Sequence, residues 1–380
     1  MDFELNEEQK LIKEAASDFA RQVLSPTVLE RDETQTFPTE EIKQLAGLGF
    51  MGMMVDPAYG GSGLDTMSYV LAMEELSKID AAASVIMSVN NSLVCWGLEK
   101  YGSSQQKEKY LPDLCNGTKI GAFCLSEPEA GSDATSQKTR AVKKGDYYEI
   151  TGTKNWITNG SSASIYLVIA QTDPSKGHKG ISAFIVEKNS PGFEVGPKEN
   201  KLGIRSSDTH SLQFNAVKVP EENRIGAEGF GFTFAMKTLS GGRIGIAAQA
   251  LGIAAGAYEL ALNYAKQREA FGKPISQHQA IAFKLAQMHT KIEAARHLVY
   301  KAAWEKDRGM NYDLSGAMAK LNASEVAMEV SVEAVQVLGG NGFVKEYHVE
   351  RLMRDAKITQ IYEGTSEIQQ MVISRAILKD

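Results

Sequence analysis

Hydrophobic residues recur along the chain with two different periods, and the period changes twice. From Asn6 to the first proline, apolar residues return every three or four positions, which predicts a helix with Asn6 and Gln9 at its cap. Further helical segments are predicted at 40–48, 66–102 and 104–114. The second of these is apolar on several faces, which is typical of buried helices. We therefore expect a helical domain over residues 1–120.

Near residue 120 the period falls from 3.6 to 2. Short runs rich in β-branched and aromatic residues lie at 121–126, 146–158, 164–172, 180–188 and 210–220. Glycine, proline, aspartate and serine separate them, which indicates antiparallel strands, and we expect a β domain over 121–226. Helical periods then return at 230–266, 277–307, 313–338 and 366–378. The last part, 227–380, is expected to be a helical bundle, so the predicted fold class is α+β.

Composition and charge exclude several classes of function. The formal charge of −6 gives no basic face for nucleic acid. Cys95, Cys115 and Cys124 form no CxxC pair, and the six histidines form no HExxH, so we expect neither a disulfide framework nor a metal site. The polar start MDFELNEEQK and the lack of a window of about 18 apolar residues predict a soluble chain without a signal peptide or membrane span.

No GxGxxG follows a strand and no GxxxxGK[ST] occurs, so a nucleotide would be held by strand edges, helix N-termini and arginines. In FCLSEPEAGSDA, Ser126 and Ser132 can offer hydroxyls to a ligand with many acceptors, or the stretch is a plain strand-to-loop connection. In KNWITNG, Trp156 and Thr158 can form a shelf for a flat polar ring, or the indole is a core residue.

Two later motifs are further candidates for ligand contact. In KQREAFGKPI, Arg268 ends a long predicted helix and can bind a pyrophosphate bidentately, or it is a solvated terminal charge. The turn GGNGF, residues 339–343, allows a close backbone approach to a ligand.

Glu363 in IYEGTSEIQQ is the candidate general base. Thr365 or Ser366 is expected to cap the last helix, and Ser366 with Gln369 makes a capping box. The helix dipole would favour the ionised carboxylate, whereas enclosure by Ile361 and Tyr362 would raise its pKa. The alternative is an acid that only stabilises a helix N-terminus.

Five motifs, in order and spacing over essentially the whole chain, resemble the acyl-CoA dehydrogenase family. They are FCLSEPEAGSDA, KNWITNG, QREAFGKPISQHQA, AVQVLGGNGF and RDAKITQIYEGTSEIQ. Their form is most similar to short-chain (butyryl) and short/branched-chain members. The resemblance implies an FAD enzyme that converts a short acyl-CoA to its trans-2-enoyl-CoA, with Glu363 taking the α-proton and the β-hydrogen leaving as hydride to FAD N5. It also implies a thioester carbonyl polarised by the Glu363 N–H and a flavin hydroxyl.

The resemblance also implies two sets of ligand contacts. The FAD contacts are Phe123, Leu125, Ser126, Gly131, Ser132, Trp156, Ile157, Thr158, Thr365, Ser366 and Glu367, with Arg268, Phe271, Gln279, Gln336, Leu338, Gly339 and Gly340. Six of these would reach FAD from a neighbouring subunit: Arg268, Gln279, Gln336, Leu338, Gly339 and Gly340. The acyl-CoA contacts are Ser132, Ser240, Arg243, Tyr362 and Gly364.

Two positions on the LSGGRIGIAAQALG segment differ among members of the family. Some carry the base immediately before the arginine, where this chain has Gly242, so the base stays at Glu363. Ser240 stands where many relatives have an aspartate that touches CoA.

The implied partners are an electron-transferring flavoprotein and three further copies of the chain in a homotetramer. The expected compartment is the bacterial cytoplasm, with a mature mitochondrial matrix chain as the alternative. An acyl-CoA oxidase that uses oxygen and a non-catalytic flavin-binding protein remain the alternative functions.

Overall fold

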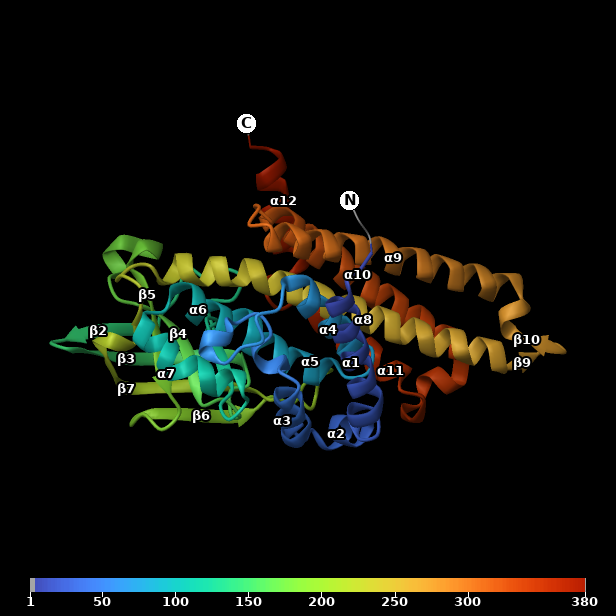
Figure 1. The fold of residues 1–380 in the computed structure, drawn as a ribbon, viewed down its shortest axis with the longest axis horizontal. Coiled ribbons are helices and arrows are strands. Elements are labelled where there is room, and N and C mark those ends of the chain that lie inside the picture. Colours follow the sequence, from blue (N-terminus) through green and yellow to red (C-terminus); the bar gives the residue numbers. More distant parts are fainter. Residues whose placement is uncertain (1–3, 380) are drawn as a thin grey trace.

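The structure is a computed structural model that describes residues 4–379. Residues 1–3 and 380, which the expected first and last domains include, lie outside the described residues. Figure 1 shows a helical part at the N-terminus, a β-sheet at one end and long helices that run from the sheet to the opposite end. The predicted α+β class and the order α, β, α are confirmed.

The N-terminal helices follow from capping signals in the sequence. They are α1 (Glu7–Phe19), α2 (Val28–Thr34), α3 (Thr39–Gly47), α4 (Thr66–Ser77), α5 (Ala81–Ser88), α6 (Trp96–Tyr101) and α7 (Ser104–Cys115), with π-helical turns at Ala20–Leu24 and Val89–Cys95. Asn6 and Gln9 form the expected capping box. The sequence did not predict α2, because seven residues with several charges show no clear period.

The β domain contains one sheet with the order β6-β7-β3-β2-β4-β5-β8, and β1 pairs with β4. Its strands are β1 (Gly121–Cys124), β2 (Arg140–Lys144), β3 (Tyr147–Thr158), β4 (Ile165–Gln171), β5 (Ile181–Glu187), β6 (Phe193–Lys198), β7 (Thr209–Pro220) and β8 (Arg224–Ile225). Most pairs are antiparallel as expected, but β4 runs parallel to β1 and to one residue of β2. The short or polar strands β2, β6 and β8 were not predicted.

The C-terminal part is built around one long helix. Its elements are α8 (Gly231–Gln267), the hairpin β9 (Glu269–Ala270) and β10 (Lys273–Pro274), α9 (Gln279–Asp307), α10 (Asp313–Leu338), α11 (Val349–Thr359) and α12 (Ser366–Ile377). Glycines and alanines of α8 allow close packing; at Gly252, for example, a Cβ would collide with the backbone of α4. Helix α11 was not predicted.

The expectation that no segment is apolar enough to span a membrane was wrong. Two helical segments, Ala81–Tyr101 and Gly231–Gln267, are long and apolar enough by length and composition. Their most apolar windows are 94% and 83% buried inside the protein, as core helices are.

Two neighbouring residues of α11 connect the three parts of the molecule. Arg354 pairs with Asp32 of α2 at 2.7 Å and donates to the carbonyl of Leu202 in the loop before β7. Asp355 accepts a hydrogen bond from the N–H of Ile204 in the same loop. The C-terminal end of α11, which leads into the next turn, is therefore fixed to both the N-terminal helices and the β domain.

Candidate active site

The turn between α11 and α12 places Glu363 in a left-handed backbone conformation, with φ of +51°, followed by Gly364 at +94°. Thr365 caps α12 by accepting from the Ile368 N–H, as one of the two predicted caps. The predicted Ser366–Gln369 capping box was wrong. Ser366 donates to Glu325 of α10, and the Gln369 amide instead donates to the carbonyls of Glu363 and Gly364.

The Glu363 carboxylate lies against the backbone of α8 at Gly242. A Cβ at position 242 would overlap Glu363 Oε2 and lie 2.8 Å from Leu93 Cδ2. Oε2 is buried and has no hydrogen-bond partner among residues 4–379. Gly242 therefore creates the space that the carboxylate occupies, and Leu93 forms one wall.

Burial raises the pKa of Glu363 to about 7, against the charges of Lys320 and Arg243, which lower it. The raised pKa agrees with the predicted desolvation. Of the two neighbours expected to enclose the carboxylate, Ile361 is 48% exposed, and Tyr362 donates its hydroxyl to Gln249 of α8. A carboxylate with a pKa near neutrality and a free oxygen is suited to proton abstraction.

The N–H of Glu363 has no hydrogen-bond acceptor among the described residues. It is therefore free to donate to a ligand oxygen next to its own carboxylate. On α8, the buried Arg243 has its Nε without a partner, so it too can receive a polar ligand. Ser240 is in the same part of α8, but its hydroxyl donates to the Met236 carbonyl of its own helix at 3.2 Å.

One turn further along α8, the space beside the helix is filled. Gly245 faces the buried Tyr69 of α4, and a Cβ there would lie 3.3 Å from Tyr69 Cζ and 2.9 Å from Ser88 Oγ. Tyr69 and Ser88 share a hydrogen bond of 2.8 Å. Tyr69 and Ser88 thus form a wall beside α8 at Gly245, one helical turn from the Gly242 that faces Glu363.

In the β domain, the two predicted flavin loops lie side by side. The Asn155 N–H donates to the Ser126 carbonyl at 2.8 Å, and Lys154 Nζ donates to the Leu125 carbonyl at 3.0 Å. Lys154 also forms a buried salt bridge of 2.7 Å with Glu127. Sequence reasoning missed this pair, because a lysine in a strand gives no sign of its burial.

Trp156 is at a break in the strand register, with φ of +60° and 62% exposure. An uncovered indole beside the Ser126 loop fits a flat aromatic ring system, so the residues present are compatible with the isoalloxazine of FAD. Gly131 and Ser132 lie in the exposed loop after β1. Phe123, Leu125 and Ile157 are buried in the same part of the β domain.

The remaining predicted FAD contacts lie elsewhere. Arg268 caps the end of α8, Phe271 in the β9–β10 turn is 97% exposed, and Gln279 begins α9. Gln336 and Leu338 end α10, where Gly339 and Gly340 follow at its cap. Figure 1 places the β9–β10 hairpin at the end of the molecule opposite the β domain. A single chain therefore does not bring Arg268 and Trp156 together.

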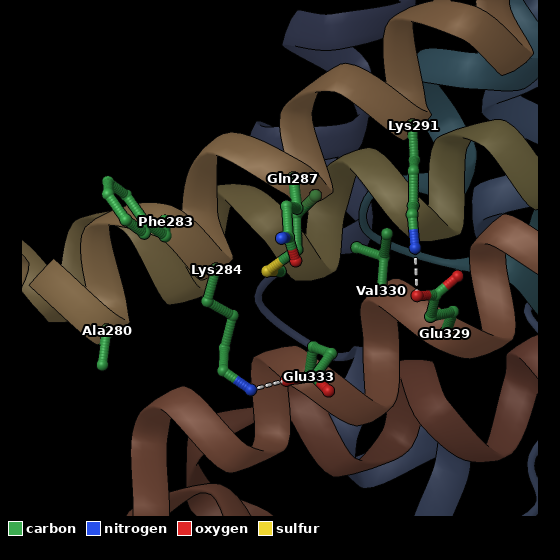
Figure 2. Close-up of a pocket in the computed structure, with 9 residues that line it drawn as sticks. Ala280, Phe283, Lys284, Gln287, Lys291, Glu329, Val330 and Glu333 are labelled. Atoms are coloured by element: carbon green, nitrogen blue, oxygen red, sulfur yellow. Dashed lines mark hydrogen bonds and ion pairs between the residues drawn. The ribbon is translucent and has the colours of Figure 1, made fainter.

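A pocket of about 210 Å³ lies between α9 and α10, and sequence reasoning did not find it. Figure 2 shows the residues that line it. Its two lysines are paired, Lys284 with Glu333 and Lys291 with Glu329. Both lysines are paired, and no predicted site residue lines the pocket. The Glu363 site therefore remains the candidate active site. Within residues 4–379 no cluster of histidine, cysteine, aspartate and glutamate is placed to hold a metal ion.

Three family models cover almost the whole chain: the acyl-CoA dehydrogenase N-terminal domain over residues 6–118, the middle domain over 122–217 and the C-terminal domain over 229–378. The chain therefore belongs to the acyl-CoA dehydrogenase family, which is a family of FAD-dependent oxidoreductases, so the predicted family, enzyme class and cofactor are confirmed.

Curated relatives and solved structures match over the full length. A short-chain specific acyl-CoA dehydrogenase of Clostridium acetobutylicum is 51% identical over 379 residues, with 100% of both chains covered. The mitochondrial short-chain specific acyl-CoA dehydrogenase of Homo sapiens is 47% identical, and the match covers 99% of this chain and 91% of the human chain. The butyryl-CoA dehydrogenase structure from Megasphaera elsdenii has a TM-score of 0.98 at 52% identity, with 100% of both chains covered.

Proposed function

We propose that the chain is a short-chain acyl-CoA dehydrogenase in which Glu363 removes the α-proton of the thioester. The observation that carries this proposal is the buried, unpartnered carboxylate against Gly242, beside a free N–H of the same residue. The carboxylate is poised to take a proton near neutral pH, and the N–H can donate to the thioester oxygen as negative charge develops there. One residue thus acts at both the α-carbon and the carbonyl oxygen of the thioester, which are bonded to the same carbonyl carbon.

Bound FAD would supply the acceptor for the hydride that must leave the β-carbon. We propose that the Ser126 and Trp156 loops hold its ring system, with Thr158, Gly131 and Ser132 at the polar edge and Thr365, Ser366 and Glu367 at the nucleotide end. The helix N-terminus of α12 favours phosphate at that position. Arg243, Tyr362, Gly364, Ser132 and Ser240 are proposed to contact the acyl-CoA. Ser240 is the weakest member of this set, because its hydroxyl already bonds Met236.

We propose that the wall of Tyr69 and Ser88, one helical turn beyond Gly242, restricts the substrate to a short acyl chain. Tyr69 and Ser88 close the space beside Gly245, one helical turn from the carboxylate. A straight four-carbon acyl group is our first choice and a 2-methyl-branched short group the second. The names of the similar enzymes from Clostridium acetobutylicum and Megasphaera elsdenii support the short-chain assignment.

The separation of the two groups of FAD contacts supports an oligomer. Arg268, Gln279 and the Gly339 turn can complete an FAD site only if another copy of the chain supplies them, and we propose a homotetramer. We also propose domain limits near residues 120 and 226, which fall in the gaps between the three matched segments.

An electron-transferring flavoprotein is the proposed acceptor, in the bacterial cytoplasm. A solved structure that matches this chain with a TM-score of 0.99 at 52% identity belongs to a study of the electron transferring flavoprotein of Acidaminococcus fermentans, which supports this acceptor. Mitochondrial relatives keep the matrix as the alternative compartment.

An anaerobic titration with butyryl-CoA, followed by visible absorption, tests the function. Wild-type protein should lose its flavin absorption band, and Glu363→Gln should retain FAD but stay oxidised. Glu346→Gln, an exposed carboxylate near α11, is the control and should behave as wild type.

Bleaching in Glu363→Gln at the wild-type rate would remove the assignment of the base. Rapid peroxide release without an acceptor protein would favour an oxidase. Wild-type FAD that no acyl-CoA bleaches would favour a non-catalytic flavin-binding protein.

A further inference from the structure

Lys320 lies in the middle of α10 with its side chain fully buried. Its Nζ donates a hydrogen bond of 2.6 Å to the carbonyl oxygen of Gly364, the residue after the proposed base. Among residues 4–379 no carboxylate lies within salt-bridge distance of this ammonium group, in contrast to the paired Lys284 and Lys291 on the neighbouring helix. Burying a cation without a carboxylate to pair with it costs free energy. The presence of Lys320 at this position therefore needs an explanation.

The groups around Lys320 come from three other segments. Burial lowers the pKa of Lys320 to about 8, and the charge of Glu363 opposes that shift. The charged groups facing it are Glu363 in the turn, Arg243 on α8, Glu325 on its own helix and Glu367 on α12. The pKa of Glu363 is about 7, so both groups titrate near neutral pH and the charge of each favours the charged form of the other.

The turn that carries Glu363 needs support, because a residue with a Cβ is strained at positive φ, and Glu363 has a φ of +51°. Two side chains hold its carbonyls. Gln369 donates to the carbonyl oxygens of Glu363 and Gly364, and Lys320 donates to that of Gly364. Only Lys320 brings a positive charge to this task.

We propose that Lys320 is a positioning residue for the proposed base: its ammonium group anchors the Glu363–Gly364 turn through the Gly364 carbonyl and stabilises the ionised Glu363 carboxylate across the site. This inference rests on the proposed role of Glu363. The anchor keeps the carboxylate against Gly242, and the charge keeps it deprotonated at a pH where burial alone would leave it neutral.

The test is the pH dependence of kcat/KM for butyryl-CoA, measured with an artificial electron acceptor. The acid limb is the part of the profile in which kcat/KM rises with pH as the base ionises. In Lys320→Met this limb should move to higher pH by about one unit, because the substitution removes a positive charge that had lowered the pKa of the base. The value of kcat/KM at pH 7 should fall about fivefold, because the ionised fraction of the base drops from about one half to about one eleventh. Lys320→Arg, which keeps charge and donor, should return the limb toward its wild-type position.

Lys306→Met is the matched control. Lys306 is a second lysine of the bundle whose pKa is lowered to about 8 by burial, but its Nζ lies near Trp96 and Met54 and has no hydrogen bond to the Glu363 turn. This variant should leave the acid limb in place. Flavin content and the melting temperature are measured for every variant to separate loss of fold from loss of charge.

An unmoved acid limb in folded, FAD-loaded Lys320→Met would overturn the inference, as would an equal shift in Lys306→Met. A fall in kcat without any shift of the limb would reduce Lys320 to a purely structural residue. If the methionine variant does not fold, the uncharged Lys320→Gln is judged by the same criterion. Failure of Glu363→Gln to lose turnover would instead remove the proposed function, so the two failures are distinguishable.

Discussion

Replacing Gly242 by alanine should displace the proposed base without adding any polar group. A methyl group at this position would lie 2.8 Å from Leu93 Cδ2 and 3.0 Å from Glu363 Cδ, and would overlap Oε2. Ordinary contacts begin near 3.4 Å, so the carboxylate must move by roughly an ångström, and a misplacement of that size can cost about a hundredfold in rate. We expect kcat to fall by about two orders of magnitude in Gly242→Ala.

Gly241→Ala is the matched control, one residue earlier on the same helix. The nearest atom to its added methyl group would be Lys306 Nζ at 3.8 Å, an ordinary contact. Both substitutions improve helix propensity by up to about 1 kcal/mol, so any difference between them comes from the contacts. Gly241→Ala should keep wild-type kcat.

The assay is stopped-flow bleaching of the flavin by butyryl-CoA, with thermal unfolding recorded for both variants. A stable Gly242→Ala protein that bleaches at the wild-type rate would refute the placement of the base against α8. A similar loss in both variants would also refute it, because the effect would then not depend on the position of the carboxylate.

Three further outcomes are expected. In wild-type protein, kcat/KM should rise with pH through about 7 as the Glu363 carboxyl ionises, and a flat profile between pH 6 and pH 8 would contradict this. Tyr69→Phe removes the hydroxyl of the wall near Gly245. The ratio of kcat/KM for pentanoyl-CoA to that for butyryl-CoA should then rise about fourfold, which corresponds to the burial of one methylene group. An unchanged ratio would show that this wall does not limit the acyl chain. Lys154→Met leaves Glu127 buried without its cation and should lower the free energy of unfolding by about 3–5 kcal/mol in a denaturant titration, with Lys154→Met/Glu127→Gln recovering much of the loss.

The long helices and the buried strands could be predicted because their periods are strong. The predicted range 313–338 and α10 coincide, and the Asn6 cap was also correct. Helix α2 and strands such as β2 were missed, because short polar segments form only when tertiary contacts hold them. Residues Arg140–Lys144 have a single buried side chain, so no alternation was visible in the sequence.

Sequence reasoning located the candidate base but not its surroundings. Glu363 was found from its place before a helix start, and its desolvation was predicted. Its partners, Gly242, Leu93 and Lys320, lie between 43 and 270 residues away in the chain (363 − 320 and 363 − 93), and one sequence without aligned relatives gives no sign of such contacts. The Ser366–Gln369 box failed because Gln369 is drawn to the carbonyls of the strained turn instead.

Arg354 and Asp355, which tie α11 to α2 and to the loop before β7, have a consequence for biosynthesis. Asp32 and the Ile204 N–H are synthesised long before their partners, which emerge only when more than nine-tenths of the chain has left the ribosome. Until then, the buried surfaces of both earlier parts carry polar groups without partners. A chain that stops before α11 should therefore be a substrate for chaperones and proteases, even though its first two parts are already complete.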